Sequence, residues 1–528
     1  MAGSGSASST WAPLRIGLFR TLWIAVLVSN LGEWMQTVGA QWLLVHDPHA
    51  AVLVSLVQTA DALPAVLFAL VAGVLADIFD RVKLILAVLA GLTAAGAALT
   101  ALTAAGQMPP ALLLMFTFVL GAGGILIEPA YQSLVPDMVP RPQVPAASAL
   151  GSISMNLARV VGPAIGGLLV ARTGAAAVFG LNTATFVLYA VVLAVHPRLG
   201  GTRPSPERFI PGLRAGERYA RHAPVVQRIL LRAALFLVPG SALWALLPLI
   251  AAQRLGLGSG GYGVLLGALG VGAIGGAFLV SQARARLSAN GLAAVASLAY
   301  AAALAAAALS RNVALTIVVL LPAAAAWTVF LSNVNAALQL FLPRWVRARG
   351  LSVYQMVLFG AQAGGAAIWG TVAEAAGLVP AFLTAAVVMA AGAATLRFWP
   401  FQPIADMDRS PVRWPEPQLL VSADRGSGLV LVRTTYSIAA AKEQQFLQAM
   451  PLLRQSRLRT GALGWALYRD AENPRLFIEL FSVASWEEHL RQHRERQTGT
   501  DLQYRDDAAT LSDPPPHTEH YLATDVRE

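Results

Sequence analysis

Glu33, Asp61 and Arg159 are charged residues that lie near the middle of long apolar segments of this 528-residue chain. An ionised side chain at membrane depth costs roughly 2.5–3.5 kcal/mol on insertion scales, so such residues usually face a cavity. Apolar surroundings favour the neutral acid, whereas a nearby guanidinium favours the carboxylate. A conformational change that separates Arg159 from the two acids and reunites them would therefore take up and release a proton. We expect these three residues to couple proton movement or to bind substrate, and the alternative is a structural ion pair.

Amide and aromatic side chains occur in the same apolar segments. These groups suit a bulky amphipathic compound better than an inorganic ion, because they offer hydrogen bonds beside apolar surface. Sequence alone leaves the helical phase open, so each side chain could instead face lipid or a neighbouring helix. The candidates for lining a cavity are Asn30, Gln36, Gln58, Asn156, Trp244, Trp327, Asn333, Tyr354, Gln355 and Gln362.

The composition indicates which elements must position these residues. Apolar residues make up 56% of the chain and charged residues 12%, about half the charged share of soluble domains. The absence of cysteine excludes disulfides, cysteine nucleophiles and thiolate metal sites. Crossing a membrane takes about 20 mostly apolar residues in a helix. Twelve segments fit: 19–45, 51–75, 84–105, 111–135, 144–170, 176–195, 228–252, 262–282, 291–309, 313–336, 350–372 and 378–398.

The positive charge is confined to the apolar part of the chain. Residues 1–400 hold 23 Lys and Arg against 10 Asp and Glu, whereas residues 401–528 hold 15 against 18. With the N-terminus inside, 16 of these cations fall in cytoplasmic segments and 3 in external ones. Membrane proteins typically carry such an excess of Lys and Arg on the cytoplasmic side. The net charge of +10 therefore predicts contact with a lipid bilayer and no binding of nucleic acid, and both termini are expected in the cytoplasm.

The segments divide into two similar sets of six. The fourth ends Tyr131-Gln-Ser-Leu-Val-Pro136 and the tenth ends Leu338-Gln-Leu-Phe-Leu-Pro343, each followed by a basic loop. We predict an all-α membrane protein of two six-helix bundles, as in transporters built from repeats, plus a small α+β domain. The expected parts are a disordered tail (1–13), the first bundle (14–196), a central loop (197–226), the second bundle (227–400), a linker (401–428) and the α+β domain (429–528).

Two motifs carry a family resemblance. Gly73, Asp77, Arg81 and Lys83 match the Gly-x-x-x-Asp signature and following basic residues of the major facilitator superfamily, although Asp80 replaces its usual glycine. The resemblance implies that this loop locks a gate. The corresponding loop of the second half, 281–286, lacks the aspartate, so we expect a weaker lock there.

The fifth segment contains Gly162-Pro163-x-x-Gly166-Gly167, which resembles the motif of exporters in this superfamily. The alternative is a purely structural role, as in an ordinary kinked membrane helix. Together with the first segment, 29–42, and with residues 129–132, the motif is similar to the transmembrane secretion effectors, akin to bacterial enterobactin exporters. The pattern Gly270-x-Gly-x-x-Gly275 spells a dinucleotide fingerprint, but it lies inside an apolar segment, so we expect helix packing there.

The C-terminal region predicts a βαββα(β) order. Strands are expected at 429–436, 464–468, 476–481 and 520–524, with helices at 439–457 and 485–493. This order resembles the ferredoxin-like antibiotic-biosynthesis monooxygenases, which implies dimerisation or regulation, with catalysis as the alternative. His489 and His493 have a spacing that could bind metal, but two ligands are a weak set, so we favour a solvated face and predict no metal site.

The sequence as a whole predicts a secondary exporter of small amphipathic compounds, such as a siderophore, a drug or another metabolite. We expect alternating access in the bacterial inner membrane, proton antiport and no cofactor. Its partners would be the bilayer, the cargo, protons and a second copy bound through the C-terminal domain. The alternatives are a membrane-tethered monooxygenase-like enzyme and a ligand sensor that does not transport.

Overall fold

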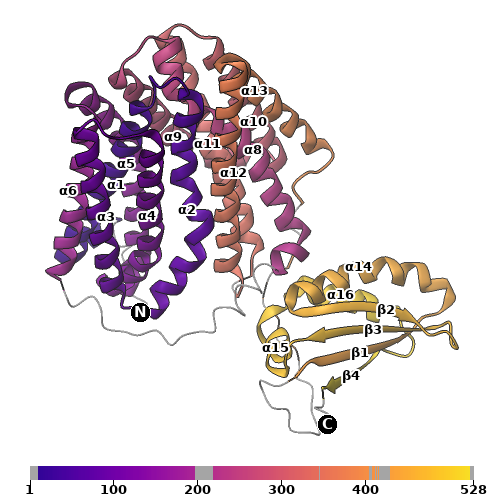
Figure 1. The fold of residues 1–528 in the computed structure, drawn as a ribbon. Coiled ribbons are helices and arrows are strands. Elements are labelled where there is room, and N and C mark those ends of the chain that lie inside the picture. Colours follow the sequence, from indigo (N-terminus) through magenta and orange to yellow (C-terminus); the bar gives the residue numbers. More distant parts are fainter. Residues whose placement is uncertain are drawn as a thin grey trace, which may run out of the picture. The chain divides into compact units, whose positions relative to one another are not determined.

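A computed structural model describes residues 10–196, 218–343, 345–402, 407–408, 410, 412, 414 and 428–523. Within these residues, twelve long helices lie at the twelve predicted segments (Figure 1), so that prediction is confirmed. They are α1 (Gly17–Leu43), α2 (Ala50–Ile78), α3 (Arg81–Ala104), α4 (Pro110–Met138), α5 (Val144–Thr173), α6 (Ala175–Ala194), α8 (Pro224–Leu249), α9 (Ser259–Arg286), α10 (Ala289–Leu309), α11 (Val313–Phe341), α12 (Arg347–Ala376) and α13 (Leu378–Ala394).

Eleven helices of the described chain are long and apolar enough to cross a membrane. The twelfth, α1, has 27 residues and is long enough, but it falls below the apolar requirement. It carries Asn30, Glu33, Gln36 and Gln41 within three turns. A helix with this many polar groups must bury them against neighbouring helices or a cavity, because lipid offers no hydrogen bonds.

The chain divides into two compact units that differ from the predicted domains. The first comprises Met1–Glu207, Leu231–Val334 and Gln355–Pro400. The second joins the C-terminal region, Phe401–Glu528, to two shorter segments, Arg208–Leu230 and Asn335–Tyr354. Most of the predicted tail, central loop and linker lies outside the described residues.

Ring contacts show why those two segments group with the C-terminal region. The Arg459 guanidinium lies 5.8 Å from the centre of the Tyr219 ring, and the Arg496 guanidinium lies 5.1 Å from the Trp345 ring. Tyr219 and Trp345 also meet edge to face, with ring centres 5.7 Å apart. Cation–π contacts of this kind stabilise by about 0.5–2 kcal/mol each.

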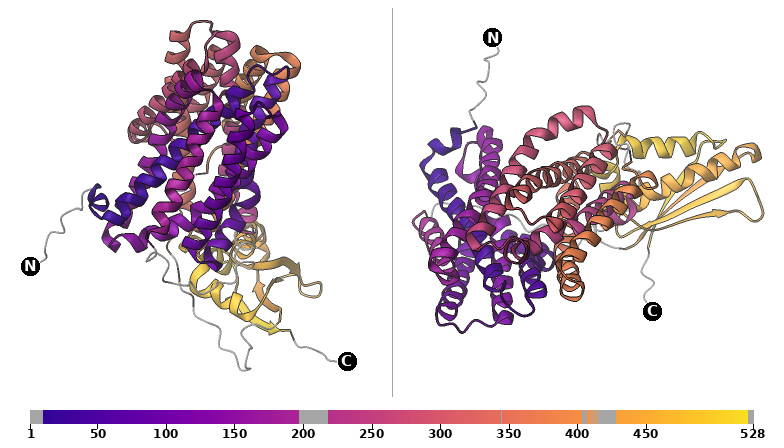
Figure 2. Two further views of the ribbon diagram at one scale, coloured as in Figure 1. Left: turned by 60° about the vertical axis from the view of Figure 1, so that its left-hand side comes forward. Right: turned by 90° about the horizontal axis from the view of Figure 1, so that it is seen from above.

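In the first unit, α1–α6 form one group of helices and α8–α13 another (Figures 1 and 2). We call these groups the N half and the C half. The face that carries the connection between Leu43 and Ala50 is named the α1–α2 face, and the opposite face, with residues 79–80, the α2–α3 face. Proline interrupts several of these helices, for example Pro64 in α2 and Pro163 in α5.

The C-terminal region contains a four-stranded antiparallel sheet in the order β2-β3-β1-β4. The strands are β1 (Val430–Ser437), β2 (Ala462–Arg469), β3 (Leu476–Val483) and β4 (His517–Leu522); the helices are α14 (Glu443–Thr460), α15 (Trp486–Arg491) and α16 (Gly499–Ala509). The predicted order of elements is therefore present, with α16 as an addition. The resemblance to monooxygenases stays a prediction.

Local sequence explains most of this region. Alternate residues of β1 and β3 are buried, as the two-residue period of a strand requires. Ser485 and Glu488 have the spacing of a capping box, but only half of it forms. Ser485 accepts a hydrogen bond from the Glu488 N–H at 3.2 Å, whereas the Glu488 carboxylate pairs with Arg491 and Arg496. A complete capping box occurs at Thr498 and Asp501, which begin α16.

Candidate functional site

Three carboxylates from three helices of the N half share one electrostatic environment. Glu33 of α1 lies within electrostatic range of both Asp61 of α2 and Glu128 of α4. α4 passes so close to Glu33 that a β-carbon at Gly124 would lie 3.3 Å from Glu33 Oε1. Glu128 accepts a hydrogen bond of 2.6 Å from the Gln132 amide one turn later. We call Glu33, Asp61 and Glu128 the acid cluster.

Arg159 does not pair with the acid cluster in this conformation. Its guanidinium lies 5.5 Å from the centre of the Trp34 ring. Its Nε is buried without a hydrogen-bond partner, and among the described residues no carboxylate forms an ion pair with it. Arg159, the expected countercharge of the acids, therefore lies on the side of α1 that carries Trp34.

The exporter motif lets α5 approach two other helices. A β-carbon at Gly162 would lie 2.8 Å from the Trp34 β-carbon, and one at Gly166 would lie 2.8 Å from the Met35 α-carbon. One at Gly167 would lie 2.9 Å from the α-carbon of Gly263 in α9. Both α1 and α9 thus pack against α5 at distances that only glycine allows. Pro163, buried between these glycines, also contributes its carbonyl to the close contact with Gly263.

Hydrogen bonds join the two halves near the α1–α2 face. The Tyr262 hydroxyl of α9 donates to Gln41 Oε1 at 2.5 Å, and the Trp42 ring stacks on Tyr262. The Thr59 hydroxyl donates to the Ala363 carbonyl at 2.9 Å. Within the described chain, the hydrogen bonds and ring contacts between the halves lie between the middle of the helices and this face. They include the contact of His49 Nδ1 with Glu374 Oε1 at 2.8 Å. Tyr262 and Glu374 are not among the predicted site residues, although Glu374 is the one carboxylate between residues 227 and 400.

The gate motif binds the start of α3 to the end of α4. Arg81 donates to the Ser133 carbonyl at 3.0 Å and lies 3.4 Å from Asp137 Oδ2. Asp80, the departure from the family pattern, caps α3 by accepting from the Lys83 N–H at 2.9 Å. The side chain of Asp77 lies outside the described residues, and a β-carbon at Gly73 would meet nothing within 4 Å.

The second half has a comparable contact despite its missing aspartate. Arg284, at the end of α9, donates to the Ser332 carbonyl of α11 at 2.7 Å. Two glycines of the dinucleotide-like pattern pack against helices as expected, whereas a β-carbon at the third, Gly275, would meet nothing within 4 Å. A β-carbon at Gly270 would lie 2.8 Å from the Val160 α-carbon, and one at Gly272 would lie 2.9 Å from the Leu321 α-carbon.

Two of the amides expected to line a cavity are buried between helices instead. Gln36 is 7% exposed and accepts a hydrogen bond of 2.5 Å from Asn182 of α6. Asn333 is 8% exposed and donates to the Ala289 carbonyl at 3.3 Å. Tyr354 is also buried. Asn156 and Gln355 are exposed, and Asn30, Gln58 and Gln362 are half-buried.

Trp244 and Trp327 belong to an aromatic cluster inside the C half. The rings of Phe236 and Phe330 stack with centres 3.9 Å apart, and Trp327 lies 5.6 Å from Phe236. The centre of the Trp327 ring lies 5.7 Å from that of Tyr300 and 5.8 Å from that of Trp244. Trp327 is buried and Trp244 half-buried, so Trp244 is the edge of the cluster. We call these five rings the aromatic cluster.

Arg232 lies near the start of α8, but its side chain does not extend to water. It is 4% exposed and reaches the end of α13. Its guanidinium donates to the carbonyls of Gly392 at 3.0 Å, Thr395 at 2.9 Å and Trp399 at 3.1 Å. A buried guanidinium surrounded by carbonyls is stable because each N–H has an acceptor.

The predicted solvated face at His489 and His493 is wrong. These side chains are 2% and 8% exposed, and His520 of β4 joins them. Burial and, to a smaller extent, the nearby His493 and His520 together lower the pKa of His489 to about 3. His489 is therefore neutral at physiological pH.

Comparison with known proteins agrees with this architecture. Residues 8–527 match the family described as transmembrane secretion effector. An MFS-type transporter of Bacillus subtilis, YfiS, is 31% identical over 34% of this chain and 42% of its own length. The multidrug efflux pump Tap of Mycobacterium tuberculosis H37Rv is 29% identical over 39% of this chain and 51% of its own length. These matches thus span about half the length of the relatives.

A solved structure shows the same fold. The inward-facing, unoccupied form of a bacterial homologue of the human lysosomal transporter Spinster aligns with a TM-score of 0.56 at 18% identity. The alignment covers 75% of this chain and 96% of that one. With the family match along nearly the whole sequence, the chain belongs to the transmembrane secretion effectors, a family of major facilitator superfamily transporters.

Proposed function

We propose that this transporter exports small amphipathic compounds and that the acid cluster couples export to proton entry. The observation that carries this proposal is the convergence of Glu33, Asp61 and Glu128 from three apolar helices. Carboxylates within electrostatic range of one another at membrane depth repel when all are ionised, so at least one favours binding a proton or a cation. The name of the relative Tap, a multidrug efflux pump, supports export as the direction.

The contacts between the halves support alternating access. With both termini inside, as the distribution of Lys and Arg favours, the α1–α2 face is the external face. Tyr262, Thr59 and His49 then close the external side, and the chain is in an inward-facing state. Outward opening would break these contacts and separate the glycines of α5 from α9. Membership in a transporter family favours this reading over a membrane-tethered oxygenase.

The test is cargo-driven proton movement in proteoliposomes, measured with an enclosed pH-sensitive dye. Ethidium and a macrolide serve as amphipathic probes. Glu33→Gln should abolish the proton signal, because the amide keeps the shape of the side chain but does not titrate. The matched control is Glu374→Gln, which removes the one carboxylate of the C half. It also removes the contact with His49, so the transport rate is expected to change, but cargo-driven proton movement should remain. Coupling of the wild-type size in Glu33→Gln would exclude Glu33 as the carrier.

A further inference from the structure

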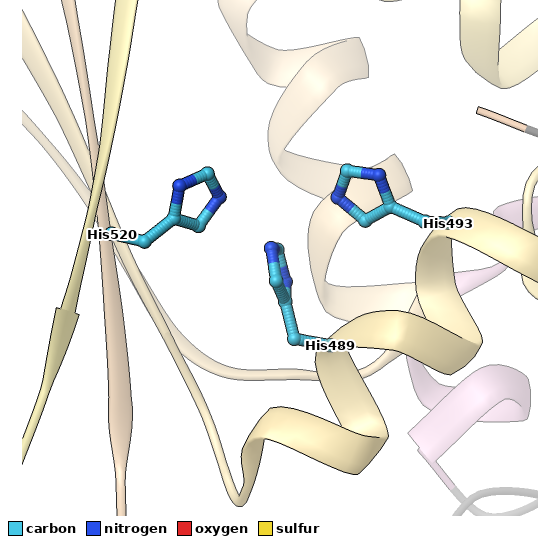
Figure 3. A group of neighbouring side chains, drawn as sticks. All are labelled: His489, His493 and His520. Atoms are coloured by element: carbon cyan, nitrogen blue, oxygen red, sulfur yellow. The ribbon is translucent and has the colours of Figure 1, made fainter. Parts of the chain in front are cut away.

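Three imidazole rings meet in the C-terminal region, and two different elements supply them (Figure 3). His489 lies in α15, and His493 lies in the π-helical turn that continues it, Gln492–Arg496. His520 comes from β4, 27 residues after His493. The ring of His489 stands between the others, with its centre 4.7 Å from that of His493 and 4.9 Å from that of His520. One ring nitrogen of each residue lies within 4.8 Å of those of the other two.

A neighbouring amide fixes which nitrogen of His489 carries the proton. His489 Nδ1 lies 3.1 Å from Gln492 Oε1, which can only accept a hydrogen bond, so Nδ1 is the protonated nitrogen. The Gln492 amide nitrogen in turn donates to the Thr460 hydroxyl at 3.4 Å, which orients the amide. The lone pair therefore lies on His489 Nε2. A hydrogen-bonded second nitrogen of this kind is the usual support of a metal-binding histidine.

The lone pair on His489 Nε2 is buried without a hydrogen-bond partner. His489 is 2% exposed, so water does not satisfy this atom from the surface. An unpartnered buried acceptor costs roughly 1–3 kcal/mol, and native structures keep few of them. A cation bound between the three rings would satisfy it.

The strand geometry directs His520 toward the helix. His520 pairs with Val432 of β1 and lies on the same face of β4 as Leu522, which packs against the core around Val430 and Trp486. His517 is an odd-numbered neighbour on the opposite face and is exposed. The two histidines of β4 therefore differ in orientation, which makes His517 a matched control.

The charges around the cluster are balanced. Arg457 is the cation within electrostatic range of His489 and His520. Its Nε donates to Glu479 Oε1 at 3.0 Å, and Glu479 is fully buried. This ion pair neutralises the guanidinium, so a divalent ion between the rings does not face an unpaired positive charge.

We propose that His489, His493 and His520 bind a late first-row divalent transition metal ion, with zinc as the first choice. Neutral imidazoles are preferred ligands of zinc, cobalt, nickel and copper. A zinc–nitrogen bond is about 2.0–2.1 Å long, so the ring nitrogens must draw together by about an ångström on binding. Three histidines leave one coordination position for water or another ligand. The bound ion would join α15 to β4.

The test uses the full-length protein in detergent, purified through an affinity tag without histidine and stripped with a chelator. Cobalt(II) is the probe, because a site with three nitrogen ligands gives visible absorption bands, and zinc(II) competes for the same site. The wild-type chain should bind one equivalent. His520→Ala and His493→Ala should abolish the bands, while His517→Ala should bind like the wild type.

A second variant separates ligation from folding. Gln492→Leu keeps all three ligands but removes the acceptor for His489 Nδ1, so affinity should fall by about 10–100-fold. Far-ultraviolet circular dichroism and the melting temperature without metal show whether each variant is folded. The proposal is overturned if the wild type gives no bands, or if His520→Ala binds as tightly as His517→Ala.

Discussion

The two halves of the membrane bundle share an architecture but differ in chemistry. Residues 14–196 hold seven Asp and Glu, whereas residues 227–400 hold one, Glu374. The N half carries the acid cluster, and the C half carries the aromatic cluster. The repeat explains the common helix arrangement, and the divergence shows that each half specialised: charge is concentrated in one and apolar ring surface in the other.

The largest expected effect is the loss of coupling from the N half. The double variant Glu33→Gln/Asp61→Asn removes two of the three carboxylates, so we expect cargo-driven proton movement to fall to the level of empty liposomes. Glu374→Gln in the C half should retain it, with a change of rate from the lost contact with His49. The measurement is the initial rate of internal pH change. Equal losses of proton movement in the two variants would show that proton coupling is not confined to the N half.

The second effect concerns packing in the C half. Trp327 contacts three other rings of the aromatic cluster and is buried. Trp327→Ala should therefore destabilise the bundle by about 3–5 kcal/mol. Trp34 of the N half is only half-buried, so Trp34→Ala should cost less. Unfolding in mixed detergent micelles gives both values, and a greater cost at Trp34 would reverse the comparison.

The third effect concerns the contact between the halves. Tyr262→Phe removes the hydrogen bond to Gln41 and should weaken closure of the α1–α2 face by about 1 kcal/mol, about a fivefold shift. Since the chain lacks cysteine, a single Ser259→Cys at the buried start of α9 reports opening by its rate of maleimide labelling.

The control for Tyr262→Phe stays within one half. The Tyr300 hydroxyl donates to the Gly240 carbonyl inside the C half at 3.0 Å, so Tyr300→Phe should not change the labelling rate at residue 259. Faster labelling in both variants would indicate general loosening of the fold rather than opening between the halves.

The smallest effect compares the two arginines near the α2–α3 face. Arg81 has a carbonyl acceptor and a carboxylate partner, whereas Arg284 has the carbonyl of Ser332. Exposed ion pairs contribute about 0.2–1 kcal/mol, so Arg81→Ala should reduce transport slightly more than Arg284→Ala. Dye efflux from cells at matched expression measures the difference. A larger loss in Arg284→Ala would show that the second half has the stronger lock.

The sequence predicted helices well because length and apolar content decide membrane spans. Every one of the twelve segments lies within a few residues of a helix in the structure. The four predicted C-terminal strands also overlap strands of the structure. A turn at Asp470 joins β2 to β3, and its carboxylate accepts from the Glu472 and Asn473 N–H groups.

Side-chain partners were harder to predict, because they depend on helical phase and on segments far away in sequence. Gln36 bonds Asn182 across 146 residues, and Tyr262 bonds Gln41 across 221. His520, the third histidine of the cluster, could not be predicted, because its place depends on the pairing of β4 with β1. The partners of Arg232 are just as distant in sequence: the carbonyls of Gly392 and Thr395 lie 160 and 163 residues further along the chain.

The arrangement at Arg232 has a practical consequence for dissecting the molecule. The carbonyls of Gly392, Thr395 and Trp399 that bind Arg232 all lie before residue 400. A stop codon placed directly after Pro400 would therefore keep these acceptors, whereas one a few residues earlier would remove the Trp399 carbonyl. Truncation at that codon can test what the appended region contributes to efflux while these contacts of Arg232 remain.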